Sequence, residues 1–253
     1  MLREANMSEE LHKVKRAIVM AAGIGKRLRP VTLSVPKPLV PVNGKRMIGT
    51  VIEALLQNGI EEIYVVVGYK KEQFSVLKEE YPCVTLIENP WYATCNNISS
   101  LYVAREHLED CMILDGDQII YEPKALAPEF CHSGYNGVWQ EGETDEWLME
   151  ADGPELSVRS CSRTGGSRGW QLYSVSRWSA EDGKKLAYHV EKEFEAGNWQ
   201  IYWDDVPMFC HAEDFRLSVY PMQKTDVVEV DNLEELIQLD PTYETYYERV
   251  GIN

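Results

Sequence analysis

The chain has 253 residues, 44% of them hydrophobic, and its 41 acidic against 25 basic side chains give a formal net charge of −16. This length and composition predict a packed α/β domain rather than a disordered chain. The charge disfavours a nucleic-acid partner, because phosphate backbones are bound by clustered Lys and Arg.

Six cysteines stand at irregular spacings without a C-x-x-C pair, which favours reduced thiols over a disulfide framework. No apolar run approaches the roughly 20 residues that span a bilayer. Residues 1–15 lack the apolar core of a signal peptide. We therefore expect a cytoplasmic protein without an integral membrane segment, in which residues 1–14 form an N-terminal extension.

Short apolar or β-branched runs alternate with helical patterns along the first half of the chain. The runs predict buried strands over residues 17–21, 63–67, 84–87 and 111–114. Apolar spacing between them predicts helices over 47–56, 71–80 and 99–108. Repeated strand–helix–strand units predict a doubly wound, mostly parallel sheet, whose ligands bind beyond the carboxyl ends of the strands.

The alternation weakens after residue 133. Strands are expected over 171–175 and 216–219, and a helix over 180–196. The tail over 231–249 has helical character and is interrupted by Pro241.

The turn after the first strand joins Gly23 and Gly25 to the basic side chains of Lys26 and Arg27. Glycines let backbone N–H groups approach phosphate oxygens, and Lys and Arg neutralise triphosphate charge. A dinucleotide fingerprint would need a third glycine where Leu28 stands, and the Gly-Lys-Ser/Thr ending of a P-loop is absent. The glycine spacing alone fits an ordinary strand-to-helix turn equally well.

Two prolines flank Lys37 and fix the direction in which it points. The string from Ala21 to Thr32, followed by Pro36-Lys37-Pro38-Leu39, resembles the signature of the sugar-1-phosphate nucleotidylyltransferase superfamily. The resemblance implies a Rossmann-like core in which the glycine-rich loop and Arg27 hold a nucleoside triphosphate, while Lys37 contacts the phosphate of an acceptor.

Residues expected to contact the nucleotide belong to this loop or to the ends of later strands. They are Ala21, Ala22, Gly23, Gly25, Gly68, Tyr69, Asn89, Asn96 and Asn97. The later ones could pair with the edge of the base through an amide or a backbone group. Asn is equally common as a loop or cap residue.

Two acidic clusters stand far apart in the chain. Asp117 follows a predicted buried strand, and Glu229 and Asp231 share one side of an extended segment. Carboxylates suit Mg²⁺, although either cluster alone could be a cap or a turn. In the resembling family, an aspartate at each of these places meets the other across the metal. This makes Asp117 and Asp231 the expected ligands, with Glu229 as a third.

The acceptor is suggested by three segments: residues 96–102, Glu146-Trp147 and Tyr202-Trp203-Asp204. They resemble the bacterial CTP:phosphocholine cytidylyltransferases. A quaternary ammonium is held by aromatic faces and nearby carboxylates, so Trp147, Tyr202, Trp203 and Asp204 are expected to bind choline. By composition alone, these aromatics would more often belong to the core.

The sequence thus predicts a Mg²⁺-dependent enzyme that joins CTP and phosphocholine into CDP-choline and releases pyrophosphate. Its single domain, 15–253, is divided into a nucleotide-binding core (15–132), an acceptor-binding region (133–220) and a C-terminal segment with a metal ligand and helices (221–253). Alternatives are transfer to a sugar 1-phosphate or to 2-aminoethylphosphonate, a non-catalytic nucleotide sensor or a dinucleotide-dependent oxidoreductase. The oligomeric state stays open, a homodimer included.

Overall fold

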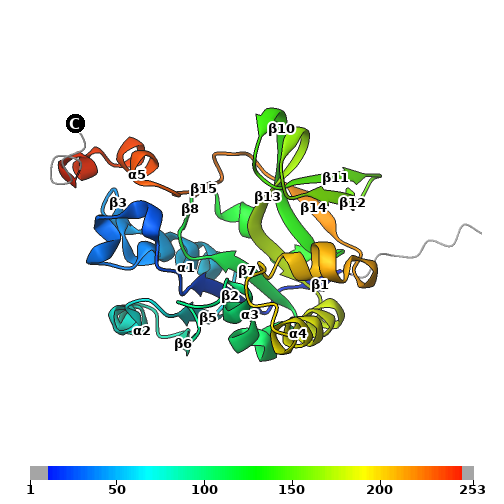
Figure 1. The fold of residues 1–253 in the computed structure, drawn as a ribbon, viewed down its shortest axis with the longest axis horizontal. Coiled ribbons are helices and arrows are strands. Elements are labelled where there is room, and N and C mark those ends of the chain that lie inside the picture. The colour runs from blue at the N-terminus through cyan, green and yellow to red at the C-terminus, as the bar shows by residue number, and fades with distance from the viewer. Residues whose placement is uncertain (1–10, 247–253) are drawn as a thin grey trace, which may run out of the picture.

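The computed structural model describes residues 11–246. A nine-stranded sheet crosses the molecule in the order β10-β14-β12-β11-β13-β7-β2-β5-β6 (Figure 1). Its strands are β2 (Arg16–Ala21), β5 (Glu62–Val67), β6 (Val84–Glu88), β7 (Cys111–Asp115), β10 (Gly134–Thr144), β11 (Leu148–Asp152), β12 (Ser157–Ser162), β13 (Gly166–Trp178) and β14 (Ser218–Pro221).

The first half of the sheet is parallel. Strands β6, β5, β2 and β7 pair in parallel, and they contain the four runs predicted from the sequence. From β7 onward the sheet continues with mainly antiparallel strands, beginning with β13 against β7. The structure therefore confirms the predicted α/β fold with a large doubly wound sheet.

Helices cover both faces of the parallel half. They are α1 (Met47–Gln57), α2 (Ser75–Glu80), α3 (Ile98–Ala104) and α4 (Ala180–Glu195), whereas α5 (Leu233–Leu239) packs in a separate cluster against Leu28 and Val31. Alternation along β2 decides the two faces: Ala17 and Val19 join the cluster that contains α1 and α2, whereas Ile18 and Met20 join the cluster of α3 and α4. None of the helices described is long and apolar enough to cross a membrane.

Short helices of other types complete the chain. Those of the 3₁₀ type cover Lys26–Leu28, Val31–Leu33, Lys37–Leu39, Lys71–Phe74, Arg105–His107, Pro123–Leu126, Ala212–Asp214 and Pro241–Tyr243, and a π-helix covers Val206–Cys210. The predicted helical tail thus becomes α5 and the 3₁₀ helix Pro241–Tyr243, which continues as helix to residue 246, and its last three residues lie outside the described part.

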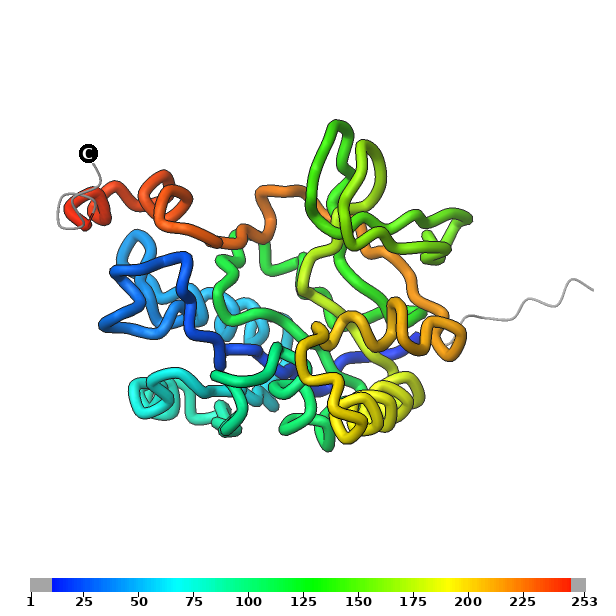
Figure 2. Tube along the Cα trace, viewed as in Figure 1, coloured from blue at the N-terminus to red at the C-terminus, as the bar shows by residue number. Residues whose placement is uncertain are grey.

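Three two-stranded pairings lie beside the main sheet. They join β1 (His12–Lys13) to β9 (Glu129–Phe130), β3 (Pro41–Val42) to β4 (Lys45–Arg46), and β8 (Gln118–Ile120) to β15 (Val227–Glu229). The first pairing, together with the buried Val14, incorporates the end of the expected 1–14 extension into the fold. The third returns the C-terminal chain to the strand that follows Asp117 (Figure 2).

Candidate active site

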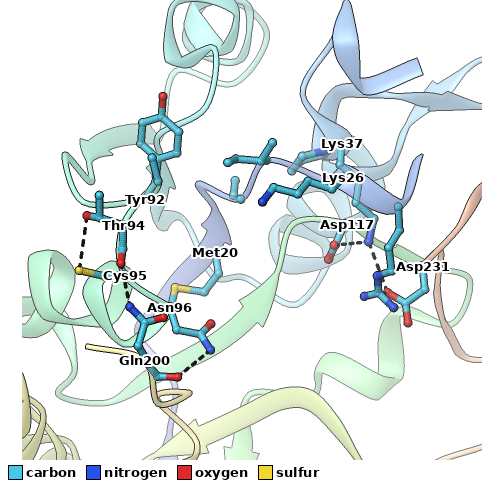
Figure 3. A pocket seen from close by; sticks show the side chains of 17 residues that line it. Met20, Lys26, Lys37, Tyr92, Thr94, Cys95, Asn96, Asp117, Gln200 and Asp231 are labelled. Atoms are coloured by element: carbon cyan, nitrogen blue, oxygen red, sulfur yellow. Dashed lines mark hydrogen bonds and ion pairs between the residues drawn. The ribbon is translucent and has the colours of Figure 1, made fainter. Parts of the chain in front are cut away.

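A cavity of about 500 Å³ opens at the carboxyl ends of the parallel strands (Figure 3). The glycine-rich loop lines one side of it, and residues 92–96, which follow β6, line another. Lys37, Asp117 and Asp231 stand together at a third side. This is the edge at which doubly wound sheets bind ligands.

Gly25 fixes the shape of the loop. Its φ of 65° is left-handed, and its carbonyl accepts a hydrogen bond of 2.8 Å from the Thr32 hydroxyl. A Cβ at this position would lie 2.9 Å from the Cβ of Lys37. The close approach of the loop to Lys37 therefore depends on a residue without a side chain.

A Gly25→Ala substitution should lower the free energy of unfolding by roughly 1–2 kcal/mol, because it combines a left-handed φ with a steric contact. Gly23→Ala is the matched control: nothing lies within 4 Å of its Cβ, and its φ is not positive. The midpoints of urea-induced unfolding measure the change in stability of both variants. Equal losses in the two variants would contradict this role for Gly25.

Lys37 begins a 3₁₀ helix and is only 7% exposed. Its Nζ lies 2.6 Å from Oδ2 of Asp117 and 3.5 Å from Oδ1 of Asp231. Burial lowers the pKa of Lys37, but the ion pair with Asp117 and the charge of Asp231 outweigh burial, so the net shift is upward. Lys37 is therefore a positive charge held between two carboxylates.

The pairing of β8 with β15 brings these carboxylates together. Gln118 faces Glu229 in an antiparallel register, so Asp117 and Asp231 leave the pairing at the same end. Asp231 also accepts a hydrogen bond of 2.8 Å from Arg27. Two carboxylates that contact one cation centre are a donor set that fits Mg²⁺.

Glu229 does not join this pair. It accepts a hydrogen bond of 2.9 Å from Gln118 and lines a different cavity. Within residues 11–246, the carboxylates of Asp117, Glu229 and Asp231 do not form a group whose oxygens all lie within 4.8 Å. Surrounding protein, and then the charges of Asp117 and Asp231, raise the pKa of Glu229 to about 7. Its side chain still opens to the cavity, so solvent screens part of this effect.

The second cavity, of about 210 Å³, lies between side chains of residues 146–204 and Glu229 of β15. Trp147 and Tyr202 meet edge to face in its wall, with ring centroids 5.9 Å apart. Asp204 lies at its buried side and is 6% exposed. The cavity thus combines two of the predicted aromatic rings with the predicted carboxylate.

Asp204 is poorly solvated. Among the described residues its Oδ1 and the Tyr135 hydroxyl lack a hydrogen bond of good geometry, although the two groups lie close enough to interact. Burial raises the pKa of Asp204 to about 7, although the Tyr135 hydroxyl and the backbone N–H of Asp204 partly offset that rise. The carboxyl group of Asp204 thus has unused acceptor capacity at the buried side of the cavity.

Trp203 is a correction to the predicted choline-binding set. It is 1% exposed and does not line the cavity. Its ring stacks on Tyr135 at 5.9 Å and meets Trp178 edge to face in the core. It is buried because its large apolar surface faces the sheet rather than the cavity.

Four of the nine residues expected at the nucleotide line the larger cavity: Ala21, Gly23, Gly25 and Asn96. The other five, Ala22, Gly68, Tyr69, Asn89 and Asn97, do not line it. Their groups hold the loops that do line it, as the following contacts show.

Asn89 is 1% exposed and donates to the hydroxyls of Ser99 and Ser100. The side-chain oxygen of Asn97 accepts from the backbone N–H of Trp203, and the Tyr69 hydroxyl donates to the Thr32 carbonyl. Gly68 leaves room for Tyr92, since a Cβ there would lie 2.6 Å from the Cβ of Tyr92. The local sequence motifs give no sign that these residues are occupied by hydrogen bonds or packing contacts within the protein.

Cavity residues that the sequence analysis missed include Tyr92, Thr94, Cys95 and Gln200. Gln200 donates to the carbonyl of Thr94 at 2.8 Å, and Asn96 donates to the carbonyl of Gln200 at 3.1 Å. The loop after β6 could have been found from its place at the carboxyl end of a parallel strand. Gln200 carries no such signal.

Comparisons with known proteins identify the family of the chain. Residues 16–130 match the model of the nucleotidyl transferase family. The chain is 41% identical over 230 residues to 2-aminoethylphosphonate cytidylyltransferase of Lancefieldella rimae, covering 90% of this chain and 92% of the relative. It is 33% identical over 226 residues to choline-phosphate cytidylyltransferase of Streptococcus pneumoniae, covering 89% and 96%.

Two solved structures share the fold. The CTP:phosphocholine cytidylyltransferase of Streptococcus pneumoniae superposes with a TM-score of 0.81 at 32% identity, over 91% of this chain and 99% of that chain. The inositol-1-phosphate CTP transferase of T. maritima gives a TM-score of 0.70 at 20% identity, over 96% and 100%. The second likeness concerns the fold alone.

Proposed function

The chain belongs to the nucleotidyl transferase family, and within it to the cytidylyltransferases. From this premise we propose that it transfers a cytidylyl group from CTP to a small aminoalkyl phosphonate such as 2-aminoethylphosphonate. The proposed reaction depends on Mg²⁺. The 41% identity to a relative named for that acceptor supports the choice. This acceptor replaces phosphocholine, the first expectation from the sequence.

The observation that carries the choice is the buried carboxylate of Asp204, whose Oδ1 has no hydrogen bond of good geometry among the described residues although the Tyr135 hydroxyl lies near the carboxylate. A primary ammonium has three N–H donors and could satisfy that oxygen, whereas a quaternary ammonium has none. Glu229 and Glu146 line the same cavity and add negative charge around a cation.

Phosphocholine is the second candidate, because of the edge-to-face pair of Trp147 and Tyr202. Aromatic faces attract a quaternary ammonium through cation–π contact. The 33% identity to choline-phosphate cytidylyltransferase supports it in the same way. The two acceptors differ in whether carboxylate hydrogen bonds or ring contacts dominate, so substitutions can separate them.

The larger cavity suits the triphosphate of CTP. Backbone N–H groups of the glycine-rich loop, with Lys26 and Arg27, neutralise the phosphates, and Lys37 attracts the phosphonate of the acceptor. Asp117 and Asp231 would hold Mg²⁺, which offsets charge on phosphate oxygens when it is bound. A phosphonate oxygen attacks the α-phosphorus of CTP, the bond to the bridging oxygen breaks and pyrophosphate leaves. The reaction needs no side-chain nucleophile, because the protein holds the two substrates in position to react directly.

The test is a panel of the four nucleoside triphosphates against phosphorylated acceptors, with pyrophosphate as the readout. We expect CTP with 2-aminoethylphosphonate to give the highest kcat/KM, and CTP with phosphocholine to follow. Activity confined to a hexose 1-phosphate would refute the proposed acceptor, and activity with no CTP pair would refute cytidylyl transfer.

Asp204→Asn should reduce kcat/KM for 2-aminoethylphosphonate by about 10²-fold, because a charge-assisted hydrogen bond worth roughly 1.5–3 kcal/mol is lost. The same variant should affect phosphocholine several-fold less. Trp147→Ala should show the opposite order. Equal losses for both acceptors in both variants would show that neither residue discriminates between the cations.

The pKa of Asp204 also predicts a pH effect on stability. Its folded-state pKa of about 7 exceeds the ordinary value of 3.8, so the folded chain binds more protons than the unfolded chain between these values. The contribution of Asp204 to stability is therefore present at low pH and lost as pH rises toward 7. At pH 8, the thermal midpoint of the free Asp204→Asn variant should exceed that of the parent by on the order of a few degrees more than it does at pH 5. An unchanged difference between the two pH values would contradict the shift.

A further inference from the structure

A second cluster of ionisable groups lies outside both cavities. His189 and Glu193 stand one turn apart on α4, and they face His211 and Asp214, which follow the π-helix Val206–Cys210. Two contacts cross between the segments: Nε2 of His189 lies 2.9 Å from Oδ2 of Asp214, and Nε2 of His211 lies 2.9 Å from Oε1 of Glu193. The two imidazole rings stack with centroids 3.8 Å apart.

We propose that His189, His211 and Asp214 form a binding site for one divalent transition-metal ion, with zinc as the best fit. Each residue offers a ligand atom, and these atoms all lie within 4.8 Å of one another. Ligand atoms around a tetrahedral zinc ion lie about 3.3 Å apart, given bonds of about 2.0 Å. The three atoms therefore need to close by no more than about 1.5 Å. One imidazole also has to turn out of the stack so that both rings point a nitrogen at the ion, and the half-exposed Asp214 can follow.

The charges of the cluster favour a dication. Within residues 11–246 neither Glu193 nor Asp214 forms an ion pair with a Lys or Arg, so two carboxylates face two imidazoles. Burial, and then the charge of His211, lower the pKa of His189, although Asp214 opposes the shift. Neutral imidazole is the form that binds metal ions.

Glu193 is not one of the three proposed ligands, but it contacts the ligand His211. One of its oxygens contacts His211, and the other accepts a hydrogen bond from the side chain of Asn198. Ligand histidines are commonly oriented by such a carboxylate. Nδ1 of His189 is buried and has no hydrogen-bond partner among the described residues, so the unliganded cluster leaves this histidine only partly satisfied.

The site would tie α4 to a wall of the acceptor cavity. Tyr202 and Asp204 line that cavity and immediately precede the π-helix, which ends next to His211. A bound ion would link the end of this segment to α4. We infer a structural role for the ion, separate from the divalent ion proposed at Asp117 and Asp231.

The test uses the full chain freed of metal by a chelator and then dialysed against Zn²⁺. We expect one zinc ion per chain that survives competition by excess Mg²⁺, and a rise in the thermal midpoint on the order of 5 °C at saturating zinc. Replacement by Co²⁺ should give the visible absorption of a tetrahedral site. A chain that retains no zinc, or that gives no midpoint shift, would overturn the proposal.

Variants separate this site from other zinc contacts. His211→Ala and the half-exposed Asp214→Ala should each abolish zinc retention and the midpoint shift, with circular dichroism in the absence of metal showing that they are folded. His132→Ala is the matched control, because His132 also contacts a carboxylate, Glu155 at 3.0 Å, but lies in no such cluster. Asp117→Asn should keep the zinc. Retention in both site variants, or loss only in Asp117→Asn, would place the ion elsewhere and overturn the proposal.

Discussion

Asp117→Asn is expected to reduce kcat for cytidylyl transfer by on the order of 10³-fold at saturating CTP and Mg²⁺. The substitution keeps the size of the side chain but removes one of the two carboxylates that converge beside the larger cavity. Pyrophosphate release measures the rate. Binding of Mn²⁺ together with CTP, followed by electron paramagnetic resonance, measures the loss of the ligand directly.

Asp152→Asn is the control for this experiment. Asp152 is an exposed carboxylate on β11 that pairs with Arg159, and it lies in neither cavity. Its variant should keep full activity and Mn²⁺ binding. If Asp117→Asn retained activity within tenfold of the parent, Asp117 would not be a metal ligand in the reaction.

Lys37→Met should separate metal binding from turnover. Removal of the ammonium should lower kcat/KM by about 10²- to 10³-fold, because the acceptor phosphonate loses its cation. The same change leaves Asp117 and Asp231 without the charge that lies between them, so the free protein should bind Mn²⁺ more tightly. Titration with Mn²⁺ in the absence of nucleotide measures this gain.

Methionine suits the position because Lys37 is buried and Gly25 packs against its stem, which leaves little space for a broader side chain. For the same reason Lys37→Arg should not restore activity, although it restores the charge. Weaker binding of Mn²⁺ by Lys37→Met would show that the ammonium organises the two carboxylates rather than competing with the ion.

Much of the fold could be predicted from the sequence, because strands and helices of the parallel half have clear periodicity. The run over 17–21 and the helix starting at Met47 are examples, and both are buried on the expected faces. The family signature, rather than periodicity, led to Asp117 and Asp231. Their meeting depends on the pairing of β8 with β15, which joins segments that are over 100 residues apart.

The parts of the site that could not be predicted depend on the direction in which each side chain points and on its hydrogen-bond partners within the protein. Tyr202, Trp203 and Asp204 are adjacent, yet only the first and third line the second cavity, because the chain turns Trp203 toward the core. Asn89 was predicted to bind a ligand through its side-chain amide, whereas in the structure that amide donates hydrogen bonds to Ser99 and Ser100. Sequence shows which groups are present, whereas tertiary contacts decide which of them stay available to a ligand.

The most direct measurement supplies the enzyme with Mg²⁺, CTP and equal concentrations of 2-aminoethylphosphonate and phosphocholine. Phosphorus NMR distinguishes the phosphonate product from the phosphate product in one sample. The structure leads us to expect that the cytidylyl phosphonate and pyrophosphate form first, with CDP-choline appearing only later. Exclusive formation of CDP-choline would contradict the role given to Asp204, and unchanged CTP would contradict cytidylyl transfer to amine-bearing acceptors altogether.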